Sequence, residues 1–569
     1  MALSRVLRVS RERNHIIWLA AGIVLVVVLT AFGQIRLNDW QGEFYDALAH
    51  RDMAQFGQQL MVFAGIIAVL VVLNVLQAWF RELLKIRMRE GLTRDLLDQW
   101  MQPRHAYRLA LAGDMGINPD QRLQEDARHL TELTADLGIG LFQAGVLLVS
   151  FVNVLWVLSD RVALPYRGQP ITIPGYMVWC ALAYAAAGSS LTWWVGRPLI
   201  RYNAEHYGRE AKLRFALVRI NEAAEGIALD GGERAERRIV DGIFDGVVAI
   251  MRLLANNLAR LTWVTASYGY IALVFPIAVA SPGYFQGTLS FGALMMVVGA
   301  FNQVQTSLRW AVDNFPLIAD WSATFLRVMN FYDALLGLDR EIGTTERITV
   351  LEDPEERLEF RDLVLVMADG QATLLEGNVR VQPGERVQIV GMPGTGKVAL
   401  FRAMAGLWTQ GSGTLLLPPR SAMMFLPQRP YLPPGTLEEV LAYPAPPGTF
   451  DRAAFGEALD QVNLDRLHHA LDHGTAWDRD LSVAEQQALA IVRLILHKPH
   501  WVVMNEALDT LDEEGRANLM AILERDLAKT ALVSIDSAPL KGNFFGRTLH
   551  LRKLAPAQPV ERRRASNRS

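Results

Sequence analysis

Six long apolar segments lie in the first three fifths of the chain, and only short apolar runs follow them. The long segments are Ile16 to Phe32, Leu60 to Phe80, Leu137 to Leu158, Ile173 to Val195, Leu261 to Ala280 and Leu289 to Val312. A helix of about 20 apolar residues spans the ~30 Å hydrocarbon core of a bilayer. The pattern therefore predicts an α-helical transmembrane bundle of about six spans over residues 1–335.

Basic residues next to these segments predict the orientation of the bundle. Four of them, Arg81, Lys85, Arg87 and Arg89, follow the second segment, and Arg197 and Arg201 follow the fourth. The connections after the first, third and fifth segments contain fewer Lys and Arg residues. By the positive-inside rule, both termini of this multi-pass chain face the cytoplasm. The two cytoplasmic connections, 81–136 and 197–260, carry helical periodicity and predict long helices that project from the membrane.

The pattern changes after a polar stretch, residues 336–356, that predicts a linker. Short apolar runs then alternate with helical patterns; the runs expected to be strands are Val387 to Val390, Met423 to Leu426, Trp501 to Met504 and Ala531 to Ile535. This alternation is typical of an α/β domain, here over residues 357–554. The tail 555–569, with its Pro and Arg residues, predicts disorder.

Composition narrows the function classes. Hydrophobic residues make up 51% of the chain, and the formal net charge is −3. A nucleic-acid-binding protein needs a basic field to neutralise phosphates, so this balance argues against nucleic acid as a partner. The single cysteine, Cys180, excludes an intramolecular disulfide, and its place in an apolar segment indicates a buried thiol.

A glycine-rich loop between an apolar strand and a helix is the strongest chemical signal. It contains Gly391, Gly394, Thr395, Gly396 and Lys397. Glycines let backbone N–H groups curl around a polyphosphate, the helix N-terminus adds its dipole, and the lysine neutralises phosphate charge. The loop therefore predicts a polyphosphate site, in which Val398 is the next residue.

Later motifs follow in the order of an ATP-binding cassette. Phe425-Leu426-Pro427-Gln428 resembles a Q-loop, Leu481-Ser482-Val483-Ala484-Glu485-Gln486-Gln487 resembles the signature segment, Trp501-Val502-Val503-Met504-Asn505-Glu506 resembles Walker B, and Leu511-Asp512 ends a D-loop. By this resemblance, Gln428 and Glu506 take catalytic positions, with Glu506 as the general base, and Ser482 contacts nucleotide.

The N-terminal part resembles the SbmA/BacA-like branch, which is related to the peroxisomal ABC half-transporters. The matching segments are residues 38–48, 118–122 and 215–225. The resemblance implies an exporter-type fold, a homodimer and a location in the bacterial inner membrane, with lipid around it. It also implies a hydrophilic solute as substrate, such as a peptide or cobalamin, without fixing the direction of transport.

Several residues depart from the family pattern where hydrolysis needs them. Walker A normally ends in a Ser or Thr hydroxyl that coordinates Mg²⁺, but Val398 stands there. Asn505 replaces the Walker B aspartate, and a hard cation prefers a carboxylate. We therefore expect ATP binding with weak or absent Mg²⁺, and no protein metal site.

Two further departures concern the closure around the γ-phosphate. Val483 and Ala484 replace paired glycines, which permit close backbone approach because they lack a Cβ atom. Ser537 occupies the position of the switch histidine. Because phosphoryl transfer depends on positioning and electrostatic stabilisation, these changes together predict poor or absent hydrolysis.

Three functions remain open from the sequence. The first is an ATP-driven transporter of reduced rate. The second, equally weighted, is a proton-driven secondary transporter whose cassette is a structural or regulatory relic, with a titrating carboxylate. The candidates for that carboxylate are Glu43, Asp46, Asp313, Glu222 and Glu225. The third is a receptor that uses ATP occupancy as a signal.

Overall fold

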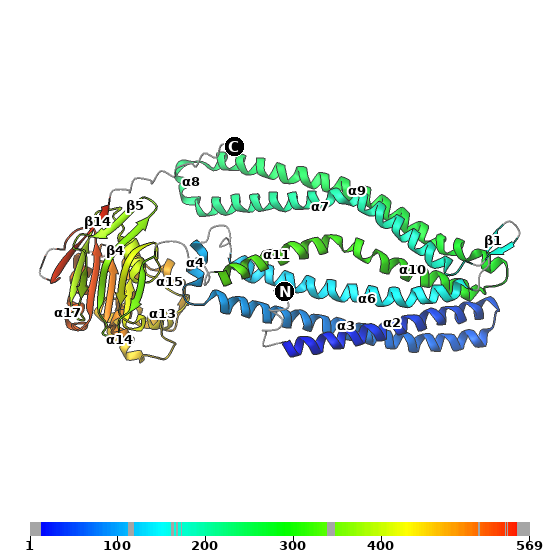
Figure 1. The fold of residues 1–569 in the computed structure, drawn as a ribbon, viewed down its shortest axis with the longest axis horizontal. Helices are drawn as coiled ribbons and strands as arrows, with labels where there is room; N and C mark the ends of the chain where they lie inside the picture. Colours follow the sequence, from blue (N-terminus) through cyan, green and yellow to red (C-terminus); the bar gives the residue numbers. More distant parts are fainter. Residues whose placement is uncertain are drawn as a thin grey trace, which may run out of the picture. The chain divides into compact units, whose positions relative to one another are not determined.

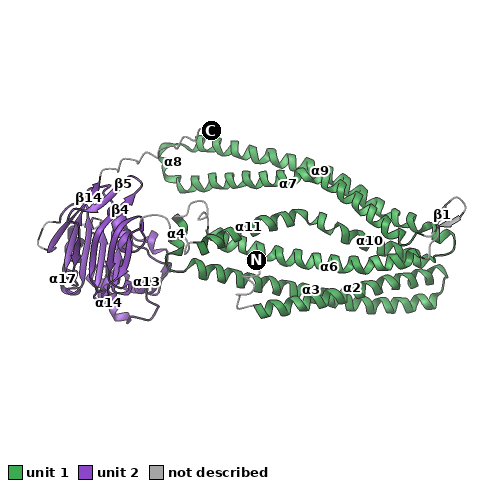
Figure 2. Cartoon of the chain, in the orientation of Figure 1, with its two compact units in different colours: residues 1–338 green, residues 339–569 purple. Residues whose placement is uncertain are grey.

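The computed structural model describes most of the chain as two compact units, Met1–Leu338 and Asp339–Ser569 (Figure 2). The described residues are 13–111, 119–160, 164–166, 169–171, 173–337, 347–509, 513–540, 542 and 544–554. Leu511 and Asp512 of the expected D-loop, the tail 555–569 and part of the expected linker lie outside them. Strand β3 (Thr349–Glu352) falls inside the stretch that the sequence assigns to the linker, and it pairs with β8 of the cassette sheet. That half of the stretch is therefore built into the second unit.

The first unit consists mainly of helices. They are α2 (Arg13–Ala49), α3 (Met53–Trp100), α4 (His105–Leu111), α5 (Pro119–Gln121), the π-turn Arg122–Asp126, α6 (Ala127–Ser159), α7 (Tyr176–Glu222), α8 (Ala224–Asp230), α9 (Glu233–Phe285), α10 (Phe291–Asp313) and α11 (Phe315–Gly337). Two short strands, β1 (Leu164–Tyr166) and β2 (Gln169–Ile171), pair between α6 and α7.

Four of the described helical stretches are long and apolar enough to cross a membrane. They are Arg13–Ala49, Met53–Trp100, Pro119–Ser159 and Glu233–Phe285. The other two expected spans lie in α7 and α10, which are helical over those residues. Their polar residues, including Asn302, Gln303 and Gln305 in α10, lower their mean hydropathy. The predicted total of six spans therefore depends on α7 and α10, for which a membrane span stays a prediction.

Helices α7 and α9 are each much longer than a bilayer is thick. They contain 47 and 53 residues, so each joins an apolar span to a polar extension without a break. Both continue through internal prolines, Pro198 in α7 and Pro276 and Pro282 in α9. They run side by side (Figure 1), and α8 connects them at the far end, where Gly231 (φ +60°) supplies a left-handed turn.

The second unit is built on a large mixed sheet. The sheet strands are β3, β4 (Leu358–Met367), β5 (Gly370–Leu374), β6 (Val379–Val381), β7 (Arg386–Val390), β8 (Gly411–Leu417), β9 (Met423–Leu426), β12 (Trp501–Asn505), β13 (Ala531–Asp536) and β14 (Arg547–Leu554). A separate pair is β10 (Gly435–Thr436) with β11 (Gly474–Thr475). The order β3-β8-β4-β5-β14-β7-β13-β12-β9, with β6 beside β4, ends in a parallel block of five strands.

Helices and apolar side chains cover both faces of the parallel block. The helices of this unit are α12 (Lys397–Met404), α13 (Leu437–Ala442), α14 (Arg452–Gln461), α15 (Trp477–Asp480), α16 (Val483–His497) and α17 (Glu513–Arg525), with 3₁₀ turns at Arg420–Ala422 and Asp465–Ala470. Alternate residues of one strand enter different cores: Val503 packs with α12, and Met504 packs with α16 and α17. The four strands expected from the sequence are present as β7, β9, β12 and β13.

Candidate functional site

The glycine-rich loop forms a tight turn between β7 and α12. Gly394 and Gly396 have φ values of +80° and +95°, which side chains with a Cβ atom rarely adopt. The loop is braced from within, because the Thr395 backbone N–H and hydroxyl both donate to the Met392 carbonyl, at 3.1 and 2.7 Å. The Gly391 N–H donates to the carbonyl of Asp536 at 3.1 Å, which fixes the loop to β13. The shape expected for a polyphosphate cradle is therefore present.

Lys397 lies at the centre of the site and contacts two residues from other strands. Its Nζ is 2.7 Å from Glu506 Oε1 and donates to the Ser537 hydroxyl at 2.5 Å. The Ser537 hydroxyl in turn donates to Glu506 Oε1 at 2.9 Å. Only 7% of the Lys397 side chain is exposed. The structure thus brings three predicted positions together and supports the placement of Ser537 after β13.

The charge of Lys397 favours the ionised form of Glu506. The Lys397 ammonium, with the Ser537 hydroxyl, holds the pKa of the Glu506 carboxyl below its usual value despite partial burial. Glu506 also has a left-handed backbone (φ 49°), and its N–H donates to the Ile535 carbonyl at 2.9 Å. The ionised carboxylate of Glu506 therefore pairs with the Lys397 ammonium, which a phosphate group of the nucleotide would also bind.

The positions that normally hold Mg²⁺ do not fit a hard cation. Val398 is 47% exposed and presents methyl groups to the cavity beside the loop. Asn505 is 7% exposed, and its Oδ1 atom has no hydrogen-bond partner within the part of the chain that the structure describes. One neutral carbonyl oxygen is a poor substitute for a hydroxyl and a carboxylate. The phosphate cradle is suited to ATP, whereas the metal ligands are missing.

The sequence did not point to several residues near the loop. A cavity of about 300 Å³ beside α12 is lined by Met367, Asp369, Arg402 and Trp408, together with loop residues. Met367 and Asp369 belong to the turn between β4 and β5, and a Cβ atom on Gly396 would lie 2.9 Å from the Met367 sulfur. The β4–β5 hairpin reaches the loop only because β14 pairs with both β5 and β7, so no local motif could have identified it.

A buried polar cluster lies on the opposite face of the same strands. The Asp536 Oδ2 atom accepts hydrogen bonds from Gln388 Nε2 at 2.7 Å and from the Ser534 hydroxyl at 2.8 Å. Asp536 is 2% exposed, and its Oδ1 atom has no partner among the described residues. Burial raises the pKa of this carboxyl, because charge is costly away from water. The cluster includes Asp536, the last residue of β13, whose backbone carbonyl accepts the hydrogen bond from Gly391.

The remaining predicted site residues lie in exposed segments. Gln428 is exposed after β9. Ser482 is the N-cap of α16 and forms a capping box with Glu485, whose N–H it accepts at 3.3 Å. Val483 is 43% exposed, and Ala484 is exposed beside it. The side chains of Val483 and Ala484 therefore project from the first turn of α16, at the surface that a second copy of the chain would have to approach.

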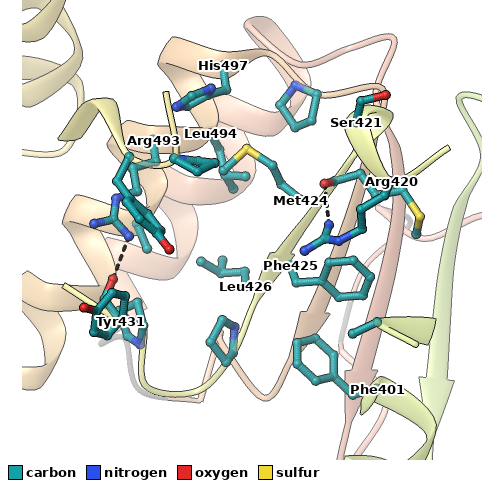
Figure 3. A pocket seen from close by; sticks show the side chains of 18 of the residues that line it. Phe401, Arg420, Ser421, Met424, Phe425, Leu426, Tyr431, Arg493, Leu494 and His497 are labelled. Carbon is teal, nitrogen blue, oxygen red and sulfur yellow. Dashed lines mark hydrogen bonds between the residues drawn. The ribbon is translucent and has the colours of Figure 1, made fainter. Parts of the chain in front are cut away.

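A larger cavity, of about 780 Å³, lies between β9, the end of α12 and α16 (Figure 3). The Arg493 guanidinium donates to the carbonyl oxygens of Val440, at 2.7 Å, and Tyr431, at 2.8 Å. Its second terminal nitrogen has no partner among the described residues, and burial lowers the pKa of Arg493 to about 10. Apolar side chains such as Phe425 and Leu494 form most of the wall.

The carboxylates proposed for proton coupling have different surroundings. Glu43 accepts a hydrogen bond from Gln59 at 2.7 Å, and Asp46 accepts from the Gly292 N–H at 2.7 Å. Asp313 pairs with Arg309 at 3.1 Å. Glu222 and Glu225 are exposed at the junction of α7 and α8. Glu43 and Asp46 thus already connect helices.

Comparison with known proteins identifies both units. The family model for the ABC transporter transmembrane region 2 matches residues 3–285, and the model for the ABC transporter domain matches residues 374–509. The chain is similar to the inner membrane ABC transporter ATP-binding protein YddA of Escherichia coli, with 27% identity over 93% of each chain. It is also similar to ABC transporter D family member 2, chloroplastic, of Arabidopsis thaliana, with 28% identity over 95% of this chain and 83% of the relative.

A solved structure supports the fold. A bacterial Atm1-family ABC exporter with ATP bound matches with a TM-score of 0.70 and 17% identity, covering 93% of this chain and 91% of the exporter. The chain is therefore an ABC half-transporter, a membrane-spanning region joined to an ATP-binding domain, and its fold is of the exporter type. It is related to the ABC D family, whose members include the Arabidopsis relative.

Proposed function

We propose that this half-transporter binds ATP but hydrolyses it poorly, and that it moves a hydrophilic solute such as a peptide or cobalamin across the bacterial inner membrane. The observation that carries the proposal is the contrast between a complete phosphate loop around Lys397 and the loss of both metal positions, Val398 and Asn505. The solute class rests on the resemblance to the SbmA/BacA-like branch.

The proposed working form is a homodimer with both cassettes in the cytoplasm. In the head-to-tail arrangement expected for ABC cassettes, the loop of one copy faces the signature segment of the other. Each composite site would then combine Val398 and Asn505 of one copy with Val483 and Ala484 of its partner. Identical copies therefore leave no intact site, and an unlike, intact partner would still share each of its two sites with this chain.

The test compares the natural chain with a restored variant in proteoliposomes. The variant carries Val398→Ser, Asn505→Asp and Ser537→His, which return the metal ligands and a γ-phosphate contact. We expect Mg²⁺-dependent ATP hydrolysis to rise about 10²-fold or more, because single clamp elements in phosphoryl-transfer sites contribute large factors. A natural chain that already hydrolyses ATP as fast as the restored one, with the activity lost in Lys397→Ala, would contradict the proposal.

A proton-driven transporter remains the second candidate, and Asp313 favours it. This carboxylate ends a predicted span, is 48% exposed and pairs with a cation there. Solute uptake under a pH gradient without nucleotide would support this candidate. Uptake that requires ATP and ignores the gradient would exclude it.

A further inference from the structure

Helix α10 carries a polar stripe on one side of an otherwise apolar span. Asn302, Gln305, Arg309 and Asp313 recur every three or four residues and so lie on one helical face. Gln305 is 7% exposed. Figure 1 shows α10 between α6 and the α7–α9 pair, and it packs on all three. Gln305 and Arg309 of the stripe therefore lie inside the bundle, and Asp313 lies at its exposed end.

Arg309 is the unusual member of this stripe, because a guanidinium stays charged in any protein environment. It follows Phe291, the first residue of α10, by 18 positions, which is about 27 Å along the helix and so near the far edge of a ~30 Å bilayer core. Only 16% of its side chain is exposed. A guanidinium held this far from water is costly unless its N–H groups find partners.

The partners of Arg309 leave part of its binding capacity unused. One terminal nitrogen pairs with Asp313 Oδ1 at 3.1 Å, and the guanidinium carbon lies 4.9 Å from the centre of the Tyr268 ring. The Nε atom is buried and has no hydrogen-bond partner among the described residues. Asp313 is half-exposed, so it can leave the pair at low cost. A guanidinium with a free nitrogen and a releasable counter-ion can accept a second anion.

Tyr268 is held rigidly against the neighbouring helix. Its hydroxyl donates to the Tyr184 carbonyl at 3.1 Å, and the Tyr184 hydroxyl donates to the Tyr268 carbonyl at 2.7 Å. The two rings stack with centres 4.3 Å apart. A Cβ atom at Gly188 would collide with the Tyr268 ring, so α7 and α9 approach closely here. The aromatic face beneath Arg309 is therefore fixed in position.

A cavity of about 770 Å³ opens beside this cluster. Its lining includes Ser189, Ser190, Leu191, Trp193 and Trp194 of α7, with Val312 of α10. Gly188, on which Tyr268 packs, directly precedes Ser189, and Val312 is one turn after Arg309. Cavities of this size hold small organic ligands in other proteins. The cavity supplies apolar walls and two hydroxyls, and Arg309 lies one helical turn before Val312, the α10 residue of its lining.

We propose that Arg309 recognises an anionic group, a carboxylate or a phosphate, on the transported solute. The solute enters the cavity of α7 and α10, its anionic group displaces Asp313 from the guanidinium, and the Tyr268 ring holds the cation in place. This inference rests on the proposed transport function, but it requires neither ATP hydrolysis nor a proton gradient.

The experiment measures the binding of matched fluorescent probes to the full chain in nanodiscs of phosphatidylcholine, without nucleotide. Dansylglycine carries a carboxylate, dansylglycinamide is its neutral equivalent, and dansyl-aminoethyl phosphate supplies the phosphate. Energy transfer from tryptophan to the dansyl group reports binding. We expect the anionic probes to bind at least tenfold more tightly than the amide. Equal affinity of all three probes would overturn the proposal.

Substitutions at the ion pair test the role of the charge. Arg309→Gln should remove the preference for anionic probes, Arg309→Lys should keep part of it, and Asp313→Asn should tighten anionic binding about threefold by removing the competing carboxylate. The matched control is Arg197→Gln, because Arg197 lies 5.5 Å from the Trp193 ring but is exposed. An unchanged preference in Arg309→Gln, or unchanged or weaker anionic binding in Asp313→Asn, would overturn the proposal.

Two further measurements check the folding of the variant and the source of the anionic group. Unchanged affinity for the neutral dansylglycinamide shows that the membrane unit of the Arg309→Gln chain is folded. Nanodiscs with added phosphatidylglycerol test whether a lipid headgroup is the natural ligand. We expect little change in dansylglycine affinity, whereas displacement of the probe by this lipid would overturn recognition of a solute. Because no nucleotide is present, ordinary ATP hydrolysis by the natural chain would refute the proposed function without affecting these results.

Discussion

Two carboxyl groups at neighbouring strand ends of the cassette have opposite pKa shifts. Glu506, directly after β12, lies 2.7 Å from the Lys397 ammonium. Asp536, the last residue of β13, has neutral partners, the Gln388 amide and the Ser534 hydroxyl. The pKa of Glu506 is lowered by a cation, and the pKa of Asp536 is raised by burial.

The difference shows that the two faces of one sheet favour opposite protonation states of a carboxyl group. Asn505 and the loop helix α12 lie on the face that holds a charged, partly exposed site. Gln388, Ser534 and Asp536 lie on the other face, where the neutral form of an acid is favoured. The side of the glycine-rich loop has a neutral amide at Asn505, and the buried side has an acid that the cation does not reach.

The largest expected effect comes from removing Lys397, the cation that lowers the pKa of Glu506 and does not contact Asp536. Lys397→Ala should weaken binding of a fluorescent ATP analogue tenfold or more, because charge-assisted contacts to phosphate are the strongest in such a site. It should also return the Glu506 pKa toward its usual value. Lys529→Ala, at an exposed lysine of the same unit, is the control. Equal affinity in the Lys397→Ala and natural chains would show that the loop does not bind nucleotide through this residue.

A smaller effect of opposite sign is expected at Glu506. Glu506→Gln removes the carboxylate that occupies Lys397 while keeping the shape of the side chain. Affinity for the nucleotide should rise about threefold, because Lys397 no longer has to give up an ion pair with Glu506 before it binds the phosphates. The measurement is an equilibrium titration at pH 7.5. A fall in affinity would mean that Glu506 orients Lys397 rather than competes with the phosphates.

The smallest effect concerns Asp536 and depends on pH. Its folded pKa is raised, so the unfolded chain releases the proton first, and stability falls as the pH rises from about 3.9 through the folded pKa. Asp536→Asn removes this loss and should raise the melting temperature at pH 8 by about 2 °C or more. The gain should vanish below pH 4, where the natural acid is protonated in both states.

Asp526→Asn is the matched control for this prediction. The Arg525 guanidinium holds the pKa of Asp526 below its usual value, so its pH dependence has the opposite sign. The substitution should lower stability at pH 8, if it changes it at all. A melting temperature that falls in Asp536→Asn as well would show that the ionised carboxylate is the favoured form in the folded chain.

The cassette was largely predictable from its sequence. Fully buried strands such as β12 and β13 have continuous apolar runs, and a glycine loop between such a strand and a helix is typical of a phosphate site. The contacts across the sheet were not predictable, because Gln388 and Asp536 are 148 residues apart and meet only through strand pairing. Their partnership has no local pattern, and neither does the approach of Met367 to Gly396.

The membrane unit shows the same limit in another form. Hydropathy located the apolar stretches, but it could not show that α7 and α9 continue without a break from membrane to polar extension. Arg309 lies inside a predicted span, and its position opposite Tyr268 depends on how α9 and α10 pack. A single charge in an apolar segment only lowers the mean hydropathy, so the pattern does not single it out.

The unbroken length of α7 has a mechanical consequence. Its 47 residues extend about 70 Å, and the paired tyrosines fasten it to α9 near one end. A rigid rod held near one end amplifies rotation, so a tilt of about 5° at Tyr184 would move the far tip, about 57 Å away, by about 5 Å. The two helices can therefore act as one long arm, which turns a small rearrangement around a solute into a displacement several times larger at the α8 turn.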